Sequence, residues 1–510
     1  MLFNSFQFIF LFLPLCILGF VFIKRAGGLS WALSWLFVCS LMFYGWHAPQ
    51  YIFLILSSVT LNFLISTRLM LKDALNKKMW LWFGVCLNLA LLGYYKYANF
   101  FVGNMNDVFG SNHIVPNILL PIGISFFTFQ QIAYLVDLSK QSQKLPSYRD
   151  YALFVTFFPQ LIAGPIVHYR EMIPQFNKIN VNYSNLYLGL SIFFIGLFKK
   201  AVIADNLALY ANPVFEGADR GEMMSFIPAW SAALAYTFQI YFDFSGYSDM
   251  AIGLARMFGI KMPENFRSPY RSLSIIDFWR RWHITLSRFL KDYLYIPLGG
   301  NRTSKPRRYL NLMIVMLLGG LWHGAGWSFI VWGALHGVYL IVNHTYRHMG
   351  QCMPIKIPDV LSWFVTFVSC VVAWVYFRAT NFEAANNIVK SMFDFKNIEL
   401  SHSVYDRVVP IVGGDYGLFS RSDISHFPSF EMLGMIAFAA FVCLFWTNTQ
   451  GFFRNNDIVL RSEENNETPK RGVRVVWNDK SFFWLLSTAF IAAIAILSSN
   501  SKVQFIYFQF

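Results

Sequence analysis

Charged residues are scarce in this sequence. They make up 13% of its 510 residues, whereas hydrophobic residues make up 56% and aromatic residues 19%. Such a composition cannot cover the surface of a soluble protein of this length. It therefore excludes a soluble enzyme or soluble binding domain, and it predicts an all-α polytopic integral membrane protein.

Cysteine is also scarce, and no Cys-x-x-Cys pair occurs among the six residues, which are Cys16, Cys39, Cys86, Cys352, Cys370 and Cys443. Scattered cysteines in apolar runs are typical of small core residues, so the sequence predicts neither a disulfide framework nor a metal site. It also lacks a glycine-rich phosphate loop and a convincing internal repeat.

Apolar runs near the length that crosses a bilayer recur along the whole chain. They lie at 1–23, 30–47, 50–67, 79–101, 117–138, 186–209, 229–256, 308–322, 327–346, 359–378, 431–447 and 482–499. We expect roughly 10 to 12 crossings in one integral domain. This domain covers residues 1–510, with peripheral spans at 1–140, a catalytic core with re-entrant segments at 150–346 and C-terminal spans and loops at 359–510.

Basic residues indicate the orientation of the chain. None precedes the first apolar run, whereas Lys24 and Arg25 follow it, so we expect a retained first span with its N-terminus outside the cytoplasm. The basic clusters at 24–25, 68–78 and 140–149 lie two spans apart and predict cytoplasmic loops. Because the net charge of +14 sits beside apolar segments, membrane lipid headgroups explain it and a nucleic-acid partner is not expected.

Most of the polar residues that interrupt apolar runs lie between residues 150 and 340. The stretch "FFPQLIAGPIVHYR" at 157–170 is interrupted by Pro159, Gly164 and Pro165, which predicts a re-entrant or irregular segment, with a proline-kinked helix as the alternative. In the span-length stretch 236–260, Asp243 requires a polar surrounding. Its role is either helix packing through an arginine partner or chemistry, and the candidate partners are Arg267, Arg271, Arg280 and Arg281.

The stretch "DFWRRWHITLSRFLKDYLYIPLGG" at 277–300 has helical periodicity with two distinct faces. The apolar stripe contains Phe278, Trp282, Leu286, Phe289 and Tyr293, and the polar face contains Arg280, His283, Ser287 and Lys291. One interpretation is an amphipathic helix on the cytoplasmic surface of the membrane. The other gives His283 a chemical role, because neighbouring cations favour the neutral, basic imidazole.

Two histidines interrupt the apolar stretch "LLGGLWHGAGWSFIVWGALHG" at 317–337. His323 lies among four glycines, and His336 is followed by one. A lone histidine in an apolar run of a soluble protein is most often a core residue. Within a membrane, however, ionisable groups often mark a substrate or proton pathway.

These motifs, together with "YFDFSGYSDMAIG" at 241–253 and the terminal "FIYFQF", make the sequence resemble the membrane-bound O-acyltransferases. Within that family it is similar to the bacterial branch that acetylates cell-surface polysaccharides and includes the alginate O-acetyltransferase membrane subunit. The resemblance implies a multi-helix fold around a central tunnel. It also implies a cytosolic acetyl-CoA donor with no bound cofactor, and an extracytoplasmic polysaccharide acceptor of the alginate type.

The resemblance further implies roles for particular residues and partners. His323 matches the family's membrane-embedded histidine, and His283 matches its second, more variable position. Relatives of this branch work with a periplasmic partner of the SGNH-hydrolase type at the bacterial inner membrane. Apart from the resemblance, the residues themselves suggest which side chains bind the donor or line the tunnel: Trp322, Arg280, Arg281, Ser287, Lys291 and Asp243.

Two other functions are compatible with the residues alone. A transporter or channel would also use broken segments and intramembrane histidines around a central cavity. A lipid O-acyltransferase of the same family would differ only in its acceptor. For an acyltransferase, His323 is expected to act either as a general base or as an acyl carrier.

Overall fold

The structure of the chain is a computed structural model. It describes residues 1–70, 74–111, 113, 118–140, 144–349, 357–395, 398–411, 420–422, 429–456, 458–460, 477, 481–499 and 505–506. The prediction for Cys352 lies outside these residues.

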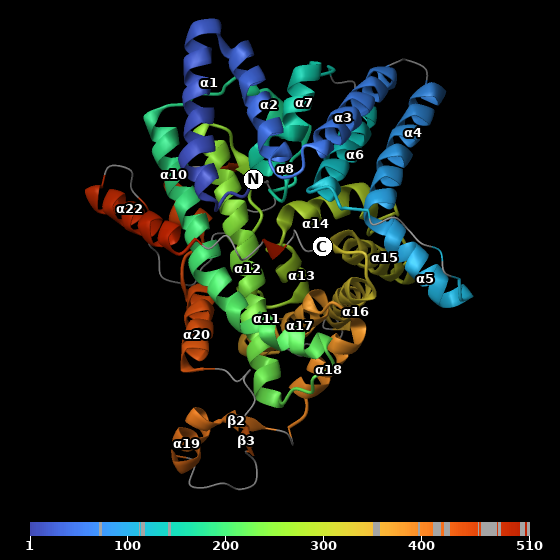
Figure 1. Cartoon of the computed structure of the whole chain (residues 1–510). Coiled ribbons are helices and arrows are strands. Elements are labelled where there is room, and N and C mark those ends of the chain that lie inside the picture. Colours follow the sequence, from blue (N-terminus) through green and yellow to red (C-terminus); the bar gives the residue numbers. More distant parts are fainter. Residues whose placement is uncertain are drawn as a thin grey trace.

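The N-terminal part of the chain forms helices that fill the upper half of the molecule in Figure 1. They are the π-helix η1 (Gln7–Phe12), α1 (Leu13–Gly27), α2 (Leu29–Gly45), α3 (Gln50–Leu69), α4 (Ala74–Leu92), the π-helix η2 (Gly93–Tyr97), α5 (Ala98–Phe109), α6 (Ile124–Lys140) and α7 (Tyr148–Thr156). Helix α5 extends outward from the side of this group.

The middle of the chain supplies the centre of the molecule, where the long helix α12 runs from the upper to the lower half. Its elements are α8 (Phe158–Leu161), α9 (Tyr169–Phe176), α10 (Tyr183–Phe198), the π-helix η3 (Lys199–Ala204), α11 (Asp205–Asp219), α12 (Phe226–Met257), β1 (Met262–Pro263), the 3-10 helix η4 (Pro269–Arg271), α13 (Ile275–Trp279), α14 (Ile284–Leu290), the π-helix η5 (Lys291–Tyr295), α15 (Lys305–His323) and α16 (Trp327–Met349).

The C-terminal part mostly covers the lower half (Figure 1). It contains α17 (Asp359–Arg378), α18 (Phe382–Met392), β2 (Glu399–Ser401), α19 (His402–Ile411), β3 (Ser420–Ser422), α20 (Phe430–Phe445), α21 (Thr449–Phe452), the 3-10 helix η6 (Arg454–Asn456), β4 (Val459–Leu460) and α22 (Phe482–Leu497). The strands form two short parallel pairs, β1 with β4 and β2 with β3. The expectation of an all-α fold is confirmed, since these pairs are its only strands among the described residues.

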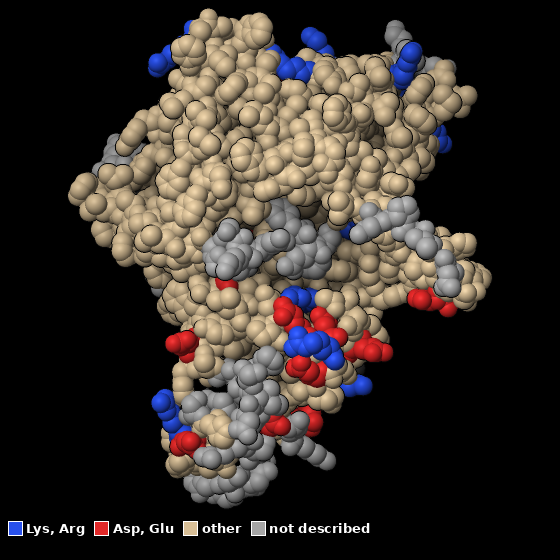
Figure 2. All heavy atoms as spheres, viewed as in Figure 1, with Lys and Arg blue, Asp and Glu red and all other residues tan. Residues whose placement is uncertain are grey.

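Every apolar run predicted as a span overlaps a helix. Within the described residues, four helical stretches are long and apolar enough to cross a membrane: Gln7–Gly27, Gln50–Leu69, Tyr183–Asp219 and Asp359–Arg378. Many large apolar side chains point outward, as lipid-facing residues do, and Figure 2 shows lysine and arginine along the upper edge of the molecule. The prediction of roughly 10 to 12 crossings stays a prediction.

Helices α10 and α12 approach each other at two pairs of glycines. A Cβ atom added at Gly246 would lie 2.7 Å from the carbonyl oxygen of Gly196, and one added at Gly253 would lie 2.6 Å from that of Gly189. Small residues are what allow helix backbones to touch in this way inside membranes. The contact fixes α12, and α12 carries the polar side chains of the molecular centre.

Those polar side chains form buried ion pairs with η3. Lys200 Nζ lies 2.7 Å from Asp243 and 2.6 Å from Asp205, and Lys199 Nζ lies 2.6 Å from Asp249. Asp243 also accepts a hydrogen bond of 2.9 Å from the backbone N–H of Ile506. The expectation of an arginine partner for Asp243 is therefore wrong, because the lysine of the neighbouring helix already neutralises this carboxylate.

The two segments with unusual motifs are both broken. Helix α7 ends at Thr156, α8 is a single turn, and residues 162–168 are non-helical, with the whole stretch 157–168 buried in protein. This confirms the predicted irregular segment and excludes the kinked helix. The predicted single helix at 277–300 is wrong, because α13 ends at Trp279 and a new helix starts at Ile284.

We predict that Gly246→Ala destabilises the protein by about 1–3 kcal/mol, because the added methyl group meets backbone atoms that cannot move separately. The measurement is the thermal unfolding midpoint of the purified protein in detergent. Gly434→Ala on α20 is the matched control, since its methyl group enters open space. Equal midpoints for the two variants would contradict the proposed close contact.

Candidate functional site

His323 is the last residue of α15, and this helix ends inside the protein. The side chain of His323 is only 3% exposed. The final carbonyl groups of any helix have no partner within the helix, and burying them unpaired costs free energy. The neighbours of these carbonyls therefore determine whether His323 can be held in place.

Two residues of η2 supply the missing donors. Lys96 Nζ donates to the carbonyl oxygens of Trp322 and His323 at 2.5 and 3.0 Å, and the Tyr97 hydroxyl donates to that of Leu321 at 2.8 Å. Lys96 also donates to Ser125 Oγ at 3.3 Å. A cation at the C-terminal end of a helix is favourable because the helix dipole is negative there. We call this arrangement the Lys96 clamp.

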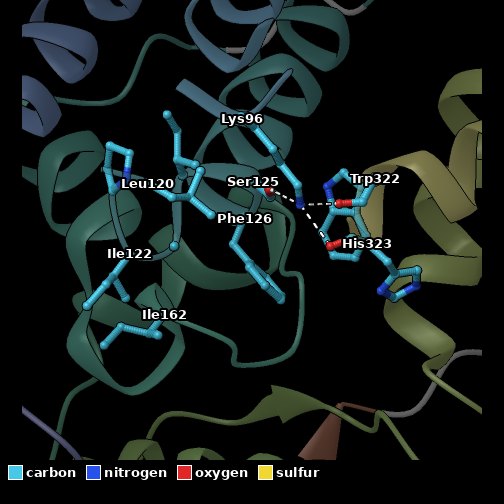
Figure 3. A pocket seen from close by; sticks show the side chains of 11 residues that line it. Lys96, Leu120, Ile122, Ser125, Phe126, Ile162, Trp322 and His323 are labelled. Carbon is cyan, nitrogen blue, oxygen red and sulfur yellow. Dashed lines mark hydrogen bonds between the residues drawn. The ribbon is translucent and has the colours of Figure 1, made fainter. Parts of the chain in front are cut away.

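The pocket beside the clamp is lined by residues from η2, the 120–126 segment, Ile162 and the end of α15. Figure 3 shows the carbonyl group of His323 turned toward Lys96, with the imidazole on the other side of the backbone. The clamp thus acts on the main chain of His323 and leaves its ring facing the interior.

Aromatic rings surround the His323 imidazole. The ring centroids of Trp322, Trp332 and Phe377 lie 4.9, 5.1 and 5.1 Å away. The indole N–H groups of Trp322 and Trp332 have no hydrogen-bond partner in the described part of the chain. Aromatic rings therefore form the walls of the site, and two indole N–H groups beside the imidazole can donate hydrogen bonds.

His283 is the next ionisable side chain along the interior, with its ring centroid 6.4 Å from that of His323. It is fully buried, and its backbone has a φ of +43°, a left-handed conformation that is rare for residues other than glycine. His283 Nδ1 lies 3.0 Å from Asn265 Oδ1. Its ring also packs edge-on against Phe244, with 4.7 Å between centroids.

The predicted setting of His283 among arginines is wrong. Because the chain turns sharply between α13 and α14, the histidine points inward while Arg280 remains exposed. Arg281 pairs with Asp277 at 2.9 Å, and Lys291 is exposed. Ser287 donates to the carbonyl oxygen of Trp282 at 3.5 Å.

Of the residues expected near the reacting centre, the structure brings together His283, His323 and Trp322. Asp243 instead forms an ion pair with Lys200 and accepts a hydrogen bond from the backbone N–H of Ile506. Sequence reasoning missed Lys96, Tyr97 and Asn265. A lysine within "LLGYYKYANF", inside a run predicted as a span, was the available signal for the clamp.

Two buried imidazoles, His283 and His323, thus lie near broken ends of helices in the interior of the protein. Comparison with known proteins identifies the class. Residues 28–385 match the model of MBOAT, the membrane-bound O-acyltransferase family. The chain belongs to this family and is a multi-pass membrane acyltransferase.

Curated relatives cover most of the chain. A peptidoglycan O-acetyltransferase of Helicobacter pylori is 46% identical over 79% of this chain and 81% of its own length. The probable alginate O-acetylase AlgI of Pseudomonas aeruginosa is 42% identical over 79% and 76%. That of Pseudomonas putida is 37% identical over 100% of both chains. The family resemblance inferred from the motifs is therefore confirmed, and the alternative of a transporter or channel is set aside.

We predict that Lys96→Met lowers the stability of the protein by about 1–3 kcal/mol, because two buried carbonyl groups lose their donor. The measurement is the thermal unfolding midpoint in detergent, together with acyltransferase activity at matched protein levels. Tyr97→Phe is the milder comparison, since it removes one hydrogen bond and costs about 1 kcal/mol. A Lys96→Met protein as stable and as active as the wild type would show that the clamp is dispensable.

Proposed function

We propose that this protein transfers an acetyl group from cytosolic acetyl-CoA across the bacterial inner membrane for O-acetylation of an extracytoplasmic polysaccharide. The observation that carries the proposal is the pair of buried imidazoles, His283 and His323, in an apolar and aromatic interior. The relatives are named as acetyltransferases of peptidoglycan and alginate, which supports a polysaccharide acceptor over a lipid. In this proposal the N-terminus lies in the periplasm, and a periplasmic partner of the SGNH-hydrolase type carries the acetyl group onward.

The chemistry requires little more than proton transfer and charge stabilisation, because acetyl-CoA is already an activated thioester. The acceptor hydroxyl oxygen attacks the thioester carbonyl carbon, the carbon–sulfur bond breaks, and CoA leaves as a thiol. His323 takes the hydroxyl proton and returns it to the departing sulfur. The indole N–H groups of Trp322 and Trp332 are available donors for the negative oxygen that develops in the transition state.

His283 lies beside His323 in the interior, with 6.4 Å between the ring centroids, and it orients the donor or relays the proton. A covalent variant is also compatible with this arrangement, in which the His323 imidazole first accepts the acetyl group and then passes it to the hydroxyl. Trapping labelled acetyl on the protein distinguishes the covalent variant from general-base catalysis.

The first test is labelled acetyl transfer in inverted membrane vesicles. We predict that His323→Ala lowers the transfer rate by about 10²–10⁴-fold, because the proton acceptor is lost. His47→Ala, which removes an exposed imidazole from the turn between α2 and α3, is the control and should transfer at the wild-type rate. Undiminished transfer by His323→Ala at matched membrane levels would contradict the assignment.

The second test concerns the donor. Arg280 is exposed in the turn between α13 and α14, three residues before His283. If its charge attracts the CoA phosphates, Arg280→Glu should raise the KM for acetyl-CoA by about tenfold at low ionic strength and leave kcat unchanged. The difference should shrink in high salt. Arg454→Glu, an exposed charge reversal in η6, is the control. An unchanged KM in Arg280→Glu would assign this arginine to lipid headgroups instead.

A further inference from the structure

We propose that Asn265 is a positioning residue that holds His283 in the tautomer with its proton on Nδ1, leaving Nε2 as the proton-accepting atom. The inference rests on the proposed function, because it explains how a buried imidazole is kept ready for proton transfer. It is carried by five hydrogen bonds around the Asn265 and Thr285 side chains.

The first step assigns the two ends of the Asn265 amide, because oxygen and nitrogen must be distinguished by their partners. The backbone N–H of Ile166 can only donate, and it points at Thr285 Oγ1 from 3.0 Å. The Thr285 hydroxyl therefore directs its own proton elsewhere, and its neighbour at 2.9 Å is the Asn265 side chain. No other acceptor for this proton lies within hydrogen-bond distance among the described residues, so the Asn265 atom at this contact accepts and is the oxygen.

Two further contacts agree with this assignment. The backbone N–H of Thr285, which also can only donate, faces the same oxygen at 3.4 Å. On its opposite side, the Asn265 Nδ2 group donates a hydrogen bond of 3.2 Å to the Ser248 hydroxyl oxygen. The amide orientation is thus determined by the backbone N–H groups of Ile166 and Thr285, and the Ser248 contact is compatible with it.

The second step gives the histidine tautomer. His283 Nδ1 lies 3.0 Å from the Asn265 oxygen. An amide oxygen has no proton to give, so Nδ1 carries the hydrogen and donates it. In a neutral imidazole the other nitrogen, Nε2, then holds the lone pair. Nε2 is buried and has no hydrogen-bond partner among the residues that the structure describes.

Two backbone hydrogen bonds flank the contact between Asn265 and His283. The Ile284 N–H donates to the Asn265 carbonyl oxygen at 3.0 Å, and the Arg267 N–H donates to the Arg281 carbonyl oxygen at 2.9 Å. These bonds tie the two chain segments together where His283 adopts its positive φ. A left-handed conformation at such a residue is unfavourable and persists only where the surroundings enforce it.

The experiment compares two replacements of Asn265 in the full-length protein. Asn265→Leu fills a similar volume but removes the acceptor, and we expect kcat for acetyl transfer to fall by about 10–100-fold. Asn265→Asp restores an acceptor oxygen and should recover the rate to within about tenfold of the wild type. Asn62→Leu is the matched control, because it removes a buried amide whose partners, Ser58 and Asn88, lie on α3 and α4, and it should keep most of the activity at matched protein levels.

The tautomer itself is read by solid-state NMR of protein with ¹⁵N-labelled histidine, with His283→Gln used to assign the signals. In the wild type, His283 should be protonated at Nδ1 and unprotonated at Nε2. In Asn265→Leu, the preference for the Nδ1-protonated tautomer should be lost. A wild-type His283 protonated at Nε2, or a folded Asn265→Leu protein with wild-type kcat, would overturn the proposal. Because the NMR result does not depend on turnover, it stands even if acetyl transfer itself is not observed.

Discussion

The termination of α15 inside the protein is the constraint on which the site depends. A helix that ends away from water leaves carbonyl groups that must be paired, and the Lys96 clamp pairs them with a lysine and a tyrosine from η2. The main chain at His323 is thereby fixed while its ring remains directed into the interior.

The same principle organises the rest of the centre. Irregular backbone near the site is tolerated because buried side chains satisfy it, as Thr285 does for the N–H of Ile166. Asn265 connects this broken segment to His283, and the glycine contacts between α10 and α12 place Ser248 behind Asn265. The two histidines are thus held by networks that come from different parts of the chain and meet at the molecular centre.

The sequence predicted those features that depend on local composition. Apolar runs located the helices, and Pro159, Gly164 and Pro165 predicted the break between α7 and α9. It could not predict the break at His283, because the apolar stripe of 277–300 fits a continuous helix and the left-handed turn is imposed by contacts with residues 265–267. The Lys96 clamp could not be predicted either, because Lys96 donates to a carbonyl group 226 positions away in the sequence. Asn265 carries no sequence signal that distinguishes it from other asparagines.

In the proposed mechanism, His283 and His323 serve one reaction centre. This claim is tested most directly by a double-mutant cycle on kcat/KM for acetyl transfer, using His283→Ala, His323→Ala and the combined variant at equal membrane levels. If the two imidazoles act as a unit, the combined variant will be about as slow as the slower single variant. If the fold-losses in kcat/KM of the two single variants instead multiply in the combined variant, the two histidines contribute independently, and a shared reaction centre is contradicted.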